Sequence, residues 1–216
     1  MEKYNSVLKF NDNGVLYQRV VFNMPIIKTG LKTNSRPLKT HFDEKSKEEN
    51  LKRAQRRAKT KVKDYVKTNT DLRYFVTYTL SDTKVGNRYD EKVVYKKLRS
   101  WLMNSVARKG FKYVLVPEQH KDGAWHFHGF TNLDLEWKLG YYASFIVRDT
   151  HLENTDRTIR YITSYIGKDG KKFNGRYYLH SNNLQEPIKT YENLDFDEES
   201  GYCQEIKNGL MVKING

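Results

Sequence analysis

The sequence predicts an α+β protein, in which strand-forming runs and amphipathic helices follow one another along the chain. Three observations favour this class. Residues 74–80 are almost all β-branched or aromatic, residues 90–109 carry apolar side chains at helical spacing, and the turn residues 121–123 separate two strand-like runs. At 216 residues the chain is long enough to bury a core and short enough for one domain, so we expect a single domain over residues 1–216.

The charge of the chain indicates a polyanionic partner. A formal net charge of +13 and 13% aromatic residues favour nucleic acid, although solubility alone would also explain the charge. The excess is local, because residues 28–67 contain 14 Lys or Arg against 5 Asp or Glu, whereas residues 186–216 contain 3 against 7. The single cysteine, Cys203, excludes an internal disulfide and a Cys-based zinc site. The chain has no apolar run of transmembrane length and no signal-peptide pattern, so we expect a cytoplasmic protein with no membrane partner.

The N-terminal third begins with a predicted β-hairpin and continues into a basic helix. Strand-like runs within residues 1–27 flank the turn at residues 11–14, and the basic stretch 28–40 that follows has no periodicity and is expected to be a loop or arm. Ser46 and Glu49 form a capping-box pattern that predicts a helix start at Ser46. Its apolar stripe comprises Leu51, Ala54, Ala58, Val62 and Tyr65. The basic side chains outside this stripe are expected to contact phosphates, and they include Arg53, Arg56, Arg57 and Lys59.

The middle of the chain supplies the next strand and helix. In the strand 74–80, Thr77 and Thr79 share one face; they are either good strand formers or hydroxyls that meet a substrate in a sheet beside the histidine strand. The predicted helix over residues 90–109 ends at Gly110 and is interpreted as structural. Residues 141–147 predict a further strand.

Two histidines in a strand suggest a metal site. His126 and His128 are two residues apart, so an extended strand places both imidazoles on one face. A three-residue loop at 121–123 would put Glu118 opposite His126 and add a carboxylate, whereas a two-residue loop would put Gln119 there. His120 shares the face of Glu118 and is the alternative third ligand. Two nitrogens and one oxygen with open coordination positions favour a catalytic divalent cation.

A short helix near residue 160 carries two stripes. Thr155 is its expected N-cap and Gly170 its expected stop. Three isoleucines, at 159, 162 and 166, form the packing stripe. Tyr161, Tyr165 and Lys168 form the second stripe, which either presents two phenols and an ammonium to a substrate or merely fills space with amphipathic tyrosines. Gly167 weakens such a helix, which suggests a close approach by another part of the chain.

These pieces together suggest phosphoryl-transfer chemistry. A tyrosine hydroxyl has a reference pKa of about 10, so as a nucleophile at neutral pH it needs help. A cation held by His126, His128 and Glu118 would polarise a phosphate oxygen, and Lys168 could stabilise the phenolate or the transition state. The product would be a covalent phosphotyrosine.

In this respect the chain resembles the rolling-circle replication initiators of the HUH endonuclease superfamily, found in plasmids and single-stranded DNA phages. Residues 75–80 are similar to the first motif of that family, His126-Phe127-His128 to its His-hydrophobe-His motif, and Tyr165-Ile166-Gly167-Lys168 to its Tyr-x-x-Lys motif. Tyr161 is similar to the paired tyrosines of phage-type members, and Arg176-Tyr177-Tyr178-Leu179 to a further segment. The resemblance spans residues 45–187, which leaves residues 1–44 as an N-terminal hairpin and basic arm and 188–216 as an acidic extension.

The resemblance implies a five-stranded antiparallel sheet flanked by helices, the RRM- or ferredoxin-like HUH endonuclease fold. It also implies an enzyme that nicks single-stranded DNA at a replication origin with Mg²⁺ or Mn²⁺, leaving a free 3′-OH and a 5′-phosphotyrosine. Tyr165 would be the principal nucleophile and Tyr161 the second, because Ser164 stands where a lysine would complete a second Tyr-x-x-Lys. Arg176, Thr77 and Thr79 are expected at the DNA. No Gly-Lys-Ser/Thr phosphate loop occurs, so a host helicase and polymerase in a bacterial cell are expected partners.

Two alternatives stay open. One is a single-tyrosine transposase with the same chemistry, which would not use Tyr161. The other is a non-catalytic module that binds single-stranded nucleic acid by stacking bases on aromatic side chains.

Overall fold

The chain divides into two compact units. The computed structural model describes residues 2–28, 44–135, 140–146, 152–167, 171–193, 203–206 and 209–212. The first unit comprises residues 1–46 and 186–216, and the second comprises residues 47–185. The boundaries of the second unit lie within two residues of the expected core at 45–187. The expectation of one domain for the whole chain stays a prediction, and each unit is described by itself.

The first unit is a five-stranded antiparallel sheet in the order β8-β1-β2-β10-β9. Its strands are β1 (Glu2–Phe10), β2 (Leu16–Lys28), β8 (Ile188–Glu192), β9 (Cys203–Ile206) and β10 (Gly209–Val212). The predicted N-terminal hairpin is confirmed, and the Asn11 side chain closes its turn by accepting hydrogen bonds from the backbone N–H groups of Asn13 and Val15. The C-terminal stretch, for which the sequence predicted only an acidic extension, adds three strands to this sheet. Most of the basic arm, at residues 29–43, and the acidic residues 195–200 lie outside the described residues.

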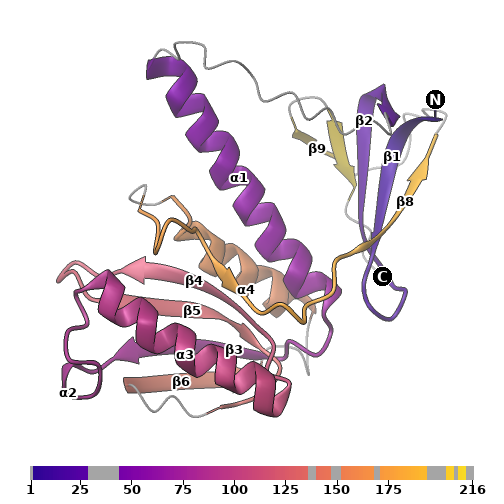
Figure 1. Cartoon of the computed structure of the whole chain (residues 1–216). Helices are drawn as coiled ribbons and strands as arrows, with labels where there is room; N and C mark the ends of the chain where they lie inside the picture. Colours follow the sequence, from indigo (N-terminus) through magenta and orange to yellow (C-terminus); the bar gives the residue numbers. More distant parts are fainter. Residues whose placement is uncertain are drawn as a thin grey trace. The chain divides into compact units, whose positions relative to one another are not determined.

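The second unit contains the five-stranded antiparallel sheet that the resemblance implied. Its strands are β3 (Tyr74–Leu80), β4 (Tyr113–Gln119), β5 (Trp125–Thr131), β6 (Gly140–Ile146) and β7 (Leu179–His180), in the order β6-β3-β5-β4-β7. The strand β5, which carries the two histidines, therefore lies at the centre between β3 and β4 (Figure 1). An α+β fold with helices flanking this sheet is confirmed.

Helices cover both faces of the second sheet. They are α1 (Glu44–Thr68), α2 (Asp82–Val85), α3 (Glu91–Lys109) and α4 (Leu152–Ser164). On one face, α3 packs its Val94, Leu98 and Leu102 against Tyr78 and Phe127 of the sheet (Figure 1). On the other face, buried residues of α1 and α4 form a second cluster with the sheet. The members from α1 and α4 are Ala58, Val62, Tyr65, Val66, Ile159 and Ile162.

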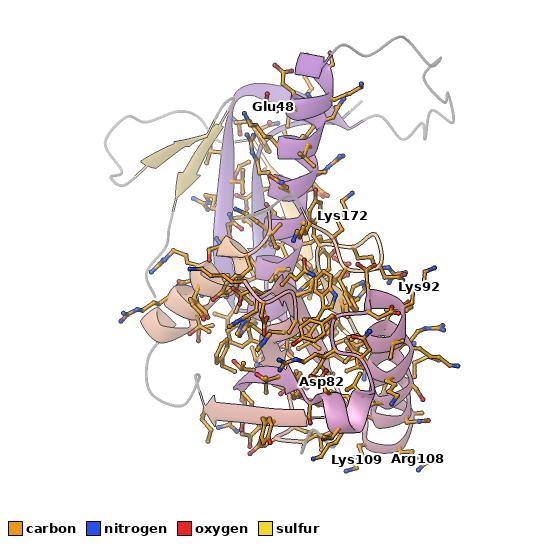
Figure 2. The ribbon with its side chains drawn as sticks, turned by 90° about the vertical axis from the view of Figure 1, so that its left-hand side faces the viewer. Glu48, Asp82, Lys92, Arg108, Lys109 and Lys172 are labelled. Carbon is orange, nitrogen blue, oxygen red and sulfur yellow. The ribbon has the colours of Figure 1, made fainter. Side chains whose placement is uncertain are left out.

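The helix α3 has the structural role that its sequence predicted. Asp90 caps its N-terminus by accepting hydrogen bonds from the N–H groups of Lys92 and Val93, and the helix ends at Gly110. Charged side chains cover the surface of α3 away from the sheet, with Lys92 at one end and Arg108 and Lys109 at the other (Figure 2). The helix thus packs by one side and presents a basic surface on the other.

Two details of α1 differ from the prediction. The helix begins at Glu44, so Ser46 lies inside its first turn and the expected start at a Ser46 cap is wrong. The apolar stripe is buried from Ala58 to Val66, but Leu51 is 41% exposed. The exposed leucine belongs to a segment in which charged side chains dominate, and periodicity alone does not tell where along a helix the core ends.

Gly129 explains how β5 and β4 approach each other directly beside the histidines. A Cβ atom at this position would lie 1.9 Å from the backbone oxygen of Val114 and 2.9 Å from Cα of Leu115, both on β4. Real Cβ contacts are never so short, so a side chain here would push the two strands apart. The glycine that follows His128 in the sequence therefore maintains the pairing on which the site depends.

No helix in the part of the chain that the structure describes is long and apolar enough to cross a membrane.

Candidate active site

The hairpin register brings a carboxylate next to the histidines. Glu118 pairs with His126 across β4 and β5, as the three-residue loop predicted, and the alternative that put Gln119 opposite His126 is wrong. The backbone N–H of His120 donates a hydrogen bond to the carbonyl of Ala124 and closes the loop. Gly123 has a φ of +89°, a conformation that favours glycine, and this is why the turn sequence fixes the register.

Each histidine is held by a threonine of the neighbouring strand. Thr77 pairs with His128 and Thr79 with His126, so all four side chains lie on one face of the sheet. The Thr77 hydroxyl lies 3.0 Å from His128 Nδ1, and the Thr79 hydroxyl lies 3.1 Å from His126 Nδ1. With both Nδ1 atoms engaged, Nε2 is the nitrogen that each imidazole has left for a ligand.

His128 and Glu118 contact each other directly. His128 Nε2 lies 2.9 Å from Glu118 Oε2, and both side chains are largely buried, at 9% and 17% exposure. Burial lowers the pKa of His128, and the hydrogen bond to Glu118 only partly offsets this. The contact is therefore a hydrogen bond from a neutral imidazole to a carboxylate at neutral pH, and the two groups form no ion pair.

His126 is also neutral at physiological pH. Burial, followed by repulsion from His120 and His128, lowers its pKa to about 4. His120, the alternative third ligand, is exposed and stacks on His126 with ring centroids 4.1 Å apart. A neutral imidazole keeps the lone pair that a metal requires, so both histidines of β5 are in the state needed for coordination.

The donor set fits a divalent cation, although the ligand shell is not assembled. Among the residues that the structure describes, no three His, Cys, Asp or Glu side chains already enclose a cation position. The pair formed by His128 and Glu118 nevertheless has suitable spacing, because two adjacent ligands about 2.1 Å from an octahedral cation lie about 3 Å apart. Their 2.9 Å separation matches that value. With the neutral nitrogen of His126 in the same row, these residues could hold Mg²⁺ or Mn²⁺.

The tyrosine helix has the predicted stripes but different ends. Ile159, Ile162 and Ile166 are buried as expected. The helix α4 begins at Leu152 and ends at Ser164, so Thr155 is an interior residue, only 3% exposed, and the prediction that it caps the helix is wrong. Tyr165 lies in the turn that follows the helix. The expected stop at Gly170 is also wrong, since the helix ends six residues earlier.

Tyr165 lies against the histidines. Its ring stacks on His128, with centroids 5.0 Å apart and planes inclined by 13°, and its hydroxyl donates a hydrogen bond of 2.6 Å to the Tyr161 hydroxyl. Tyr161 contacts the edge of the His128 ring as well, at 6.0 Å between centroids. Burial and the hydrogen bond to Tyr161 raise the pKa of Tyr165, so its phenol is protonated in the protein alone. Lys168, the expected partner of the phenolate, lies outside the described residues.

The predicted DNA-binding residues lie on several elements. Arg53, Arg56, Arg57 and Lys59 are exposed on α1, and Arg176 is exposed beside the Phe173 bridge. The structure describes no contact of these side chains with the histidines or tyrosines, and DNA contact by all of them stays a prediction. The hydroxyls of Thr77 and Thr79 hydrogen-bond to the imidazoles, a partner that the sequence pattern did not indicate.

Two residues near the site were missed by sequence reasoning. Gln55 of α1 packs against Gly167, where an added Cβ would lie 2.5 Å from the Gln55 side chain, and this accounts for the close approach that the glycine suggested. Tyr141 of β6 pairs with Thr79, so it lies on the face of the histidines, and it is 75% exposed. Only the register of β6 reveals its position, because a tyrosine in a strand is unremarkable by itself.

Comparison with known proteins gives one match. Residues 73–170, just under half of the chain, match the model of the replication-associated protein ORF2 family. This segment is similar to that family. It runs from β3 to the turn after α4 and contains both histidines, Glu118 and the two tyrosines. The match supports a replication initiator that acts on DNA. Neither the curated proteins nor the solved structures contain a match.

Proposed function

We propose that this protein initiates replication by nicking single-stranded DNA at an origin, with Tyr165 as the nucleophile. One observation carries the proposal: the Tyr165 ring stacks directly on His128, whose Nε2 contacts Glu118. A potential nucleophile and a donor set for a divalent cation thus adjoin on one sheet face, inside the segment that matches a replication-associated family. The chain's net charge of +13 suits a nucleic-acid substrate.

In the proposed reaction the Tyr165 oxygen attacks the phosphorus of one phosphodiester. A bond forms between that oxygen and phosphorus, the bond from phosphorus to the 3′ oxygen breaks, and the 3′ oxygen takes up a proton to become a free 3′-OH. The 5′ side stays on the protein as a phosphotyrosine. Because one phosphodiester is exchanged for another, a later attack by a 3′-OH can rejoin the strand.

The residues around Tyr165 have distinct proposed roles. His126, His128 and Glu118 would hold Mg²⁺ or Mn²⁺, which would polarise a phosphate oxygen and neutralise charge in the transition state. The Tyr161 hydroxyl accepts the hydrogen bond of Tyr165 and so orients the attacking oxygen. The raised pKa of Tyr165 means that the phenol needs such help to lose its proton. We assign the phenolate contact to Lys168.

The basic residues of α1 and Arg176 would hold the strand by its phosphates, and a helicase and polymerase of the host would extend the 3′-OH. Tyr161 would serve as a second nucleophile in a later step. We prefer this proposal to a single-tyrosine transposase because the two hydroxyls lie within hydrogen-bonding distance of each other, beside the same imidazole.

The proposal is tested by trapping the covalent intermediate. The protein is incubated with single-stranded origin DNA or a pool of single-stranded DNA and Mn²⁺, and a denaturing gel is examined for protein of increased mass. We expect a shifted band in the native protein that is lost in Tyr165→Phe and in the presence of EDTA.

A matched control is Tyr191→Phe, which removes one hydroxyl from a 39%-exposed tyrosine of the first unit. This variant should form the adduct like the native protein. Retention of the band in Tyr165→Phe would refute the assigned nucleophile. DNA binding that is unaffected by EDTA, with no adduct under any condition, would favour the non-catalytic binding module.

A further inference from the structure

We propose that Thr77 and Thr79 are positioning residues, which hold the imidazoles of His128 and His126 and allow the ring hydrogen to change nitrogen. This inference rests on the proposed function, because it concerns the same donor set. It gives a role to the segment 75–80, for which the sequence suggested only strand formation or substrate contact.

A repeated geometry supports this role. Thr77 faces His128, and two residues further along β3 Thr79 faces His126. The two hydroxyl-to-Nδ1 distances are 3.0 and 3.1 Å, both within the range of good hydrogen bonds. The same contact therefore occurs twice on one sheet face, at both candidate ligands. Each bond restricts rotation of one ring and turns its Nε2 away from β3.

Glu118 fixes the direction of the hydrogen bonds around His128 in the protein without a cation. A carboxylate only accepts hydrogen bonds, so His128 Nε2, 2.9 Å from Glu118 Oε2, must carry the ring hydrogen of the neutral imidazole. Nδ1 then has a lone pair, and the Thr77 hydroxyl must donate to it. In this state Thr77 is the donor and the ring is the acceptor.

Coordination through Nε2 requires the opposite arrangement. Nε2 must then offer its lone pair, the ring hydrogen must lie on Nδ1, and Thr77 must accept it. A hydroxyl can do both because it carries one hydrogen and two lone pairs and rotates freely about its C–O bond. A carbonyl or carboxylate at this position could only accept, so it would oppose the hydrogen bond between His128 and Glu118. Threonine is thus compatible with both states of the site.

A packing role for the threonines makes different predictions. Threonine and valine have almost the same shape and both favour strands, so packing alone would tolerate Val and disfavour the smaller Ser. The hydrogen-bond role predicts the reverse order, because Ser keeps the hydroxyl and Val does not. The substitutions Thr77→Val and Thr77→Ser, with Thr79→Val and Thr79→Ser, therefore separate the two explanations.

The experiment uses the full chain and two measurements. Calorimetric titration without DNA measures the affinity for Mn²⁺, and ¹⁵N NMR of the histidine rings identifies the nitrogen that carries the hydrogen, with and without Mg²⁺. We expect each Val variant to bind Mn²⁺ about 10–100-fold more weakly, the usual effect of losing an outer partner of a metal ligand. The Ser variants should stay within about threefold of the native protein, and Thr190→Val, at an exposed position on β8, should not change the affinity.

The NMR result in the native protein is decisive even if a variant does not fold. We expect the hydrogen of His128 on Nε2 without Mg²⁺ and on Nδ1 with it. A hydrogen on Nδ1 in both states, or Val variants with native Mn²⁺ affinity and native ring tautomers, would overturn the inference and leave the proposed nickase intact. If the native protein binds no Mn²⁺, the proposed function fails, and the inference, which rests on it, is overturned with it.

Discussion

Tyr165 and Tyr161 share one hydrogen bond, yet their surroundings differ. Tyr165 lies against the His128 ring and is partly buried, whereas Tyr161 is 48% exposed and contacts only the edge of that ring. The stacked phenol has its oxygen beside the candidate ligands, and the outer phenol can meet a second strand end. This difference assigns the first attack to Tyr165.

The first prediction follows from this difference. Tyr161→Phe removes the acceptor of the Tyr165 hydrogen bond but leaves the nucleophile, so nicking should continue at a rate reduced by about 3–30-fold, as expected when one hydrogen bond to the reacting group is lost. Rejoining or strand release should be lost. Both steps are measured on a labelled oligonucleotide that carries two copies of the cleavage site. Normal strand release in Tyr161→Phe would favour a single-tyrosine enzyme.

The second prediction concerns pH and His126. Its pKa is about 4 in the folded protein, below the usual 6.5, so between these values the unfolded chain binds more protons than the folded one. Stability should therefore fall as pH decreases from about 6.5 to about 4 and should level off above about 6.5. Urea unfolding from pH 4.5 to 8, in EDTA, measures this. The slope should be shallower in His126→Gln; an unchanged slope would show that His126 does not resist protonation.

At the level of elements, the hairpin of β4 and β5 was predictable in detail. The loop at 121–123 contains Gly123, whose positive φ the turn requires, and a loop of this length places Glu118 opposite His126, as the structure confirms. The helix α4 was predictable only in its stripes. Thr155 is a residue type that caps helices, yet burial against the core placed it inside the helix, and only tertiary packing decides between these outcomes.

The pairing of distant strands was not predictable. The strand β10 pairs with β2 and β7 pairs with β4, although neither short segment carries a pattern that selects its partner. Strand propensity reflects the surface on which a strand packs, and that surface is set by the rest of the fold. For the same reason, the threonine partners of the histidines follow only from the pairing of β3 with β5.

The third prediction concerns the turn after α4. Gly167 has a φ of +88°, and an added Cβ would displace the Gln55 side chain, so Gly167→Ala should lower the free energy of unfolding by roughly 1–2 kcal/mol and slow adduct formation. Gly175→Ala is the matched control, because Gly175 also has a positive φ of +74° but open space around it. It should cost similar stability in urea unfolding and leave adduct formation unchanged. Equal adduct rates in the two variants would exclude a positioning role for the Gln55 contact.

For the whole molecule, charge should decide where DNA binds. The chain carries exposed basic residues on both α1 and α3, but of these two helices only α1 packs on the sheet face that bears the histidines. The phosphates of a strand that enters the site would therefore meet α1, and the charges of α3 lie on the opposite face of the sheet.

The fourth prediction compares these two helices. Replacing Arg53, Arg56, Arg57 and Lys59 by Ala should weaken binding of single-stranded DNA and reduce the slope of log affinity against log salt by about 3, since each phosphate contact contributes about 0.7. The same change at Lys92, Lys96, Arg108 and Lys109 of α3 removes equal charge and should alter the slope much less. Fluorescence anisotropy at several salt concentrations measures both. Equal effects would mean that net charge, and no particular face, governs binding.

In the proposed reaction Tyr165 takes the 5′ end of a cleaved strand with the help of a divalent cation. Peptide mass spectrometry, after incubation with single-stranded DNA and Mn²⁺ and nuclease digestion of the bound strand, tests this step most directly. We expect a nucleotide 5′-phosphate on Tyr165, a free 3′-OH on the released fragment, and neither product in EDTA. A modified residue other than Tyr165 or Tyr161, or cleavage that leaves no covalent adduct, would contradict the proposal.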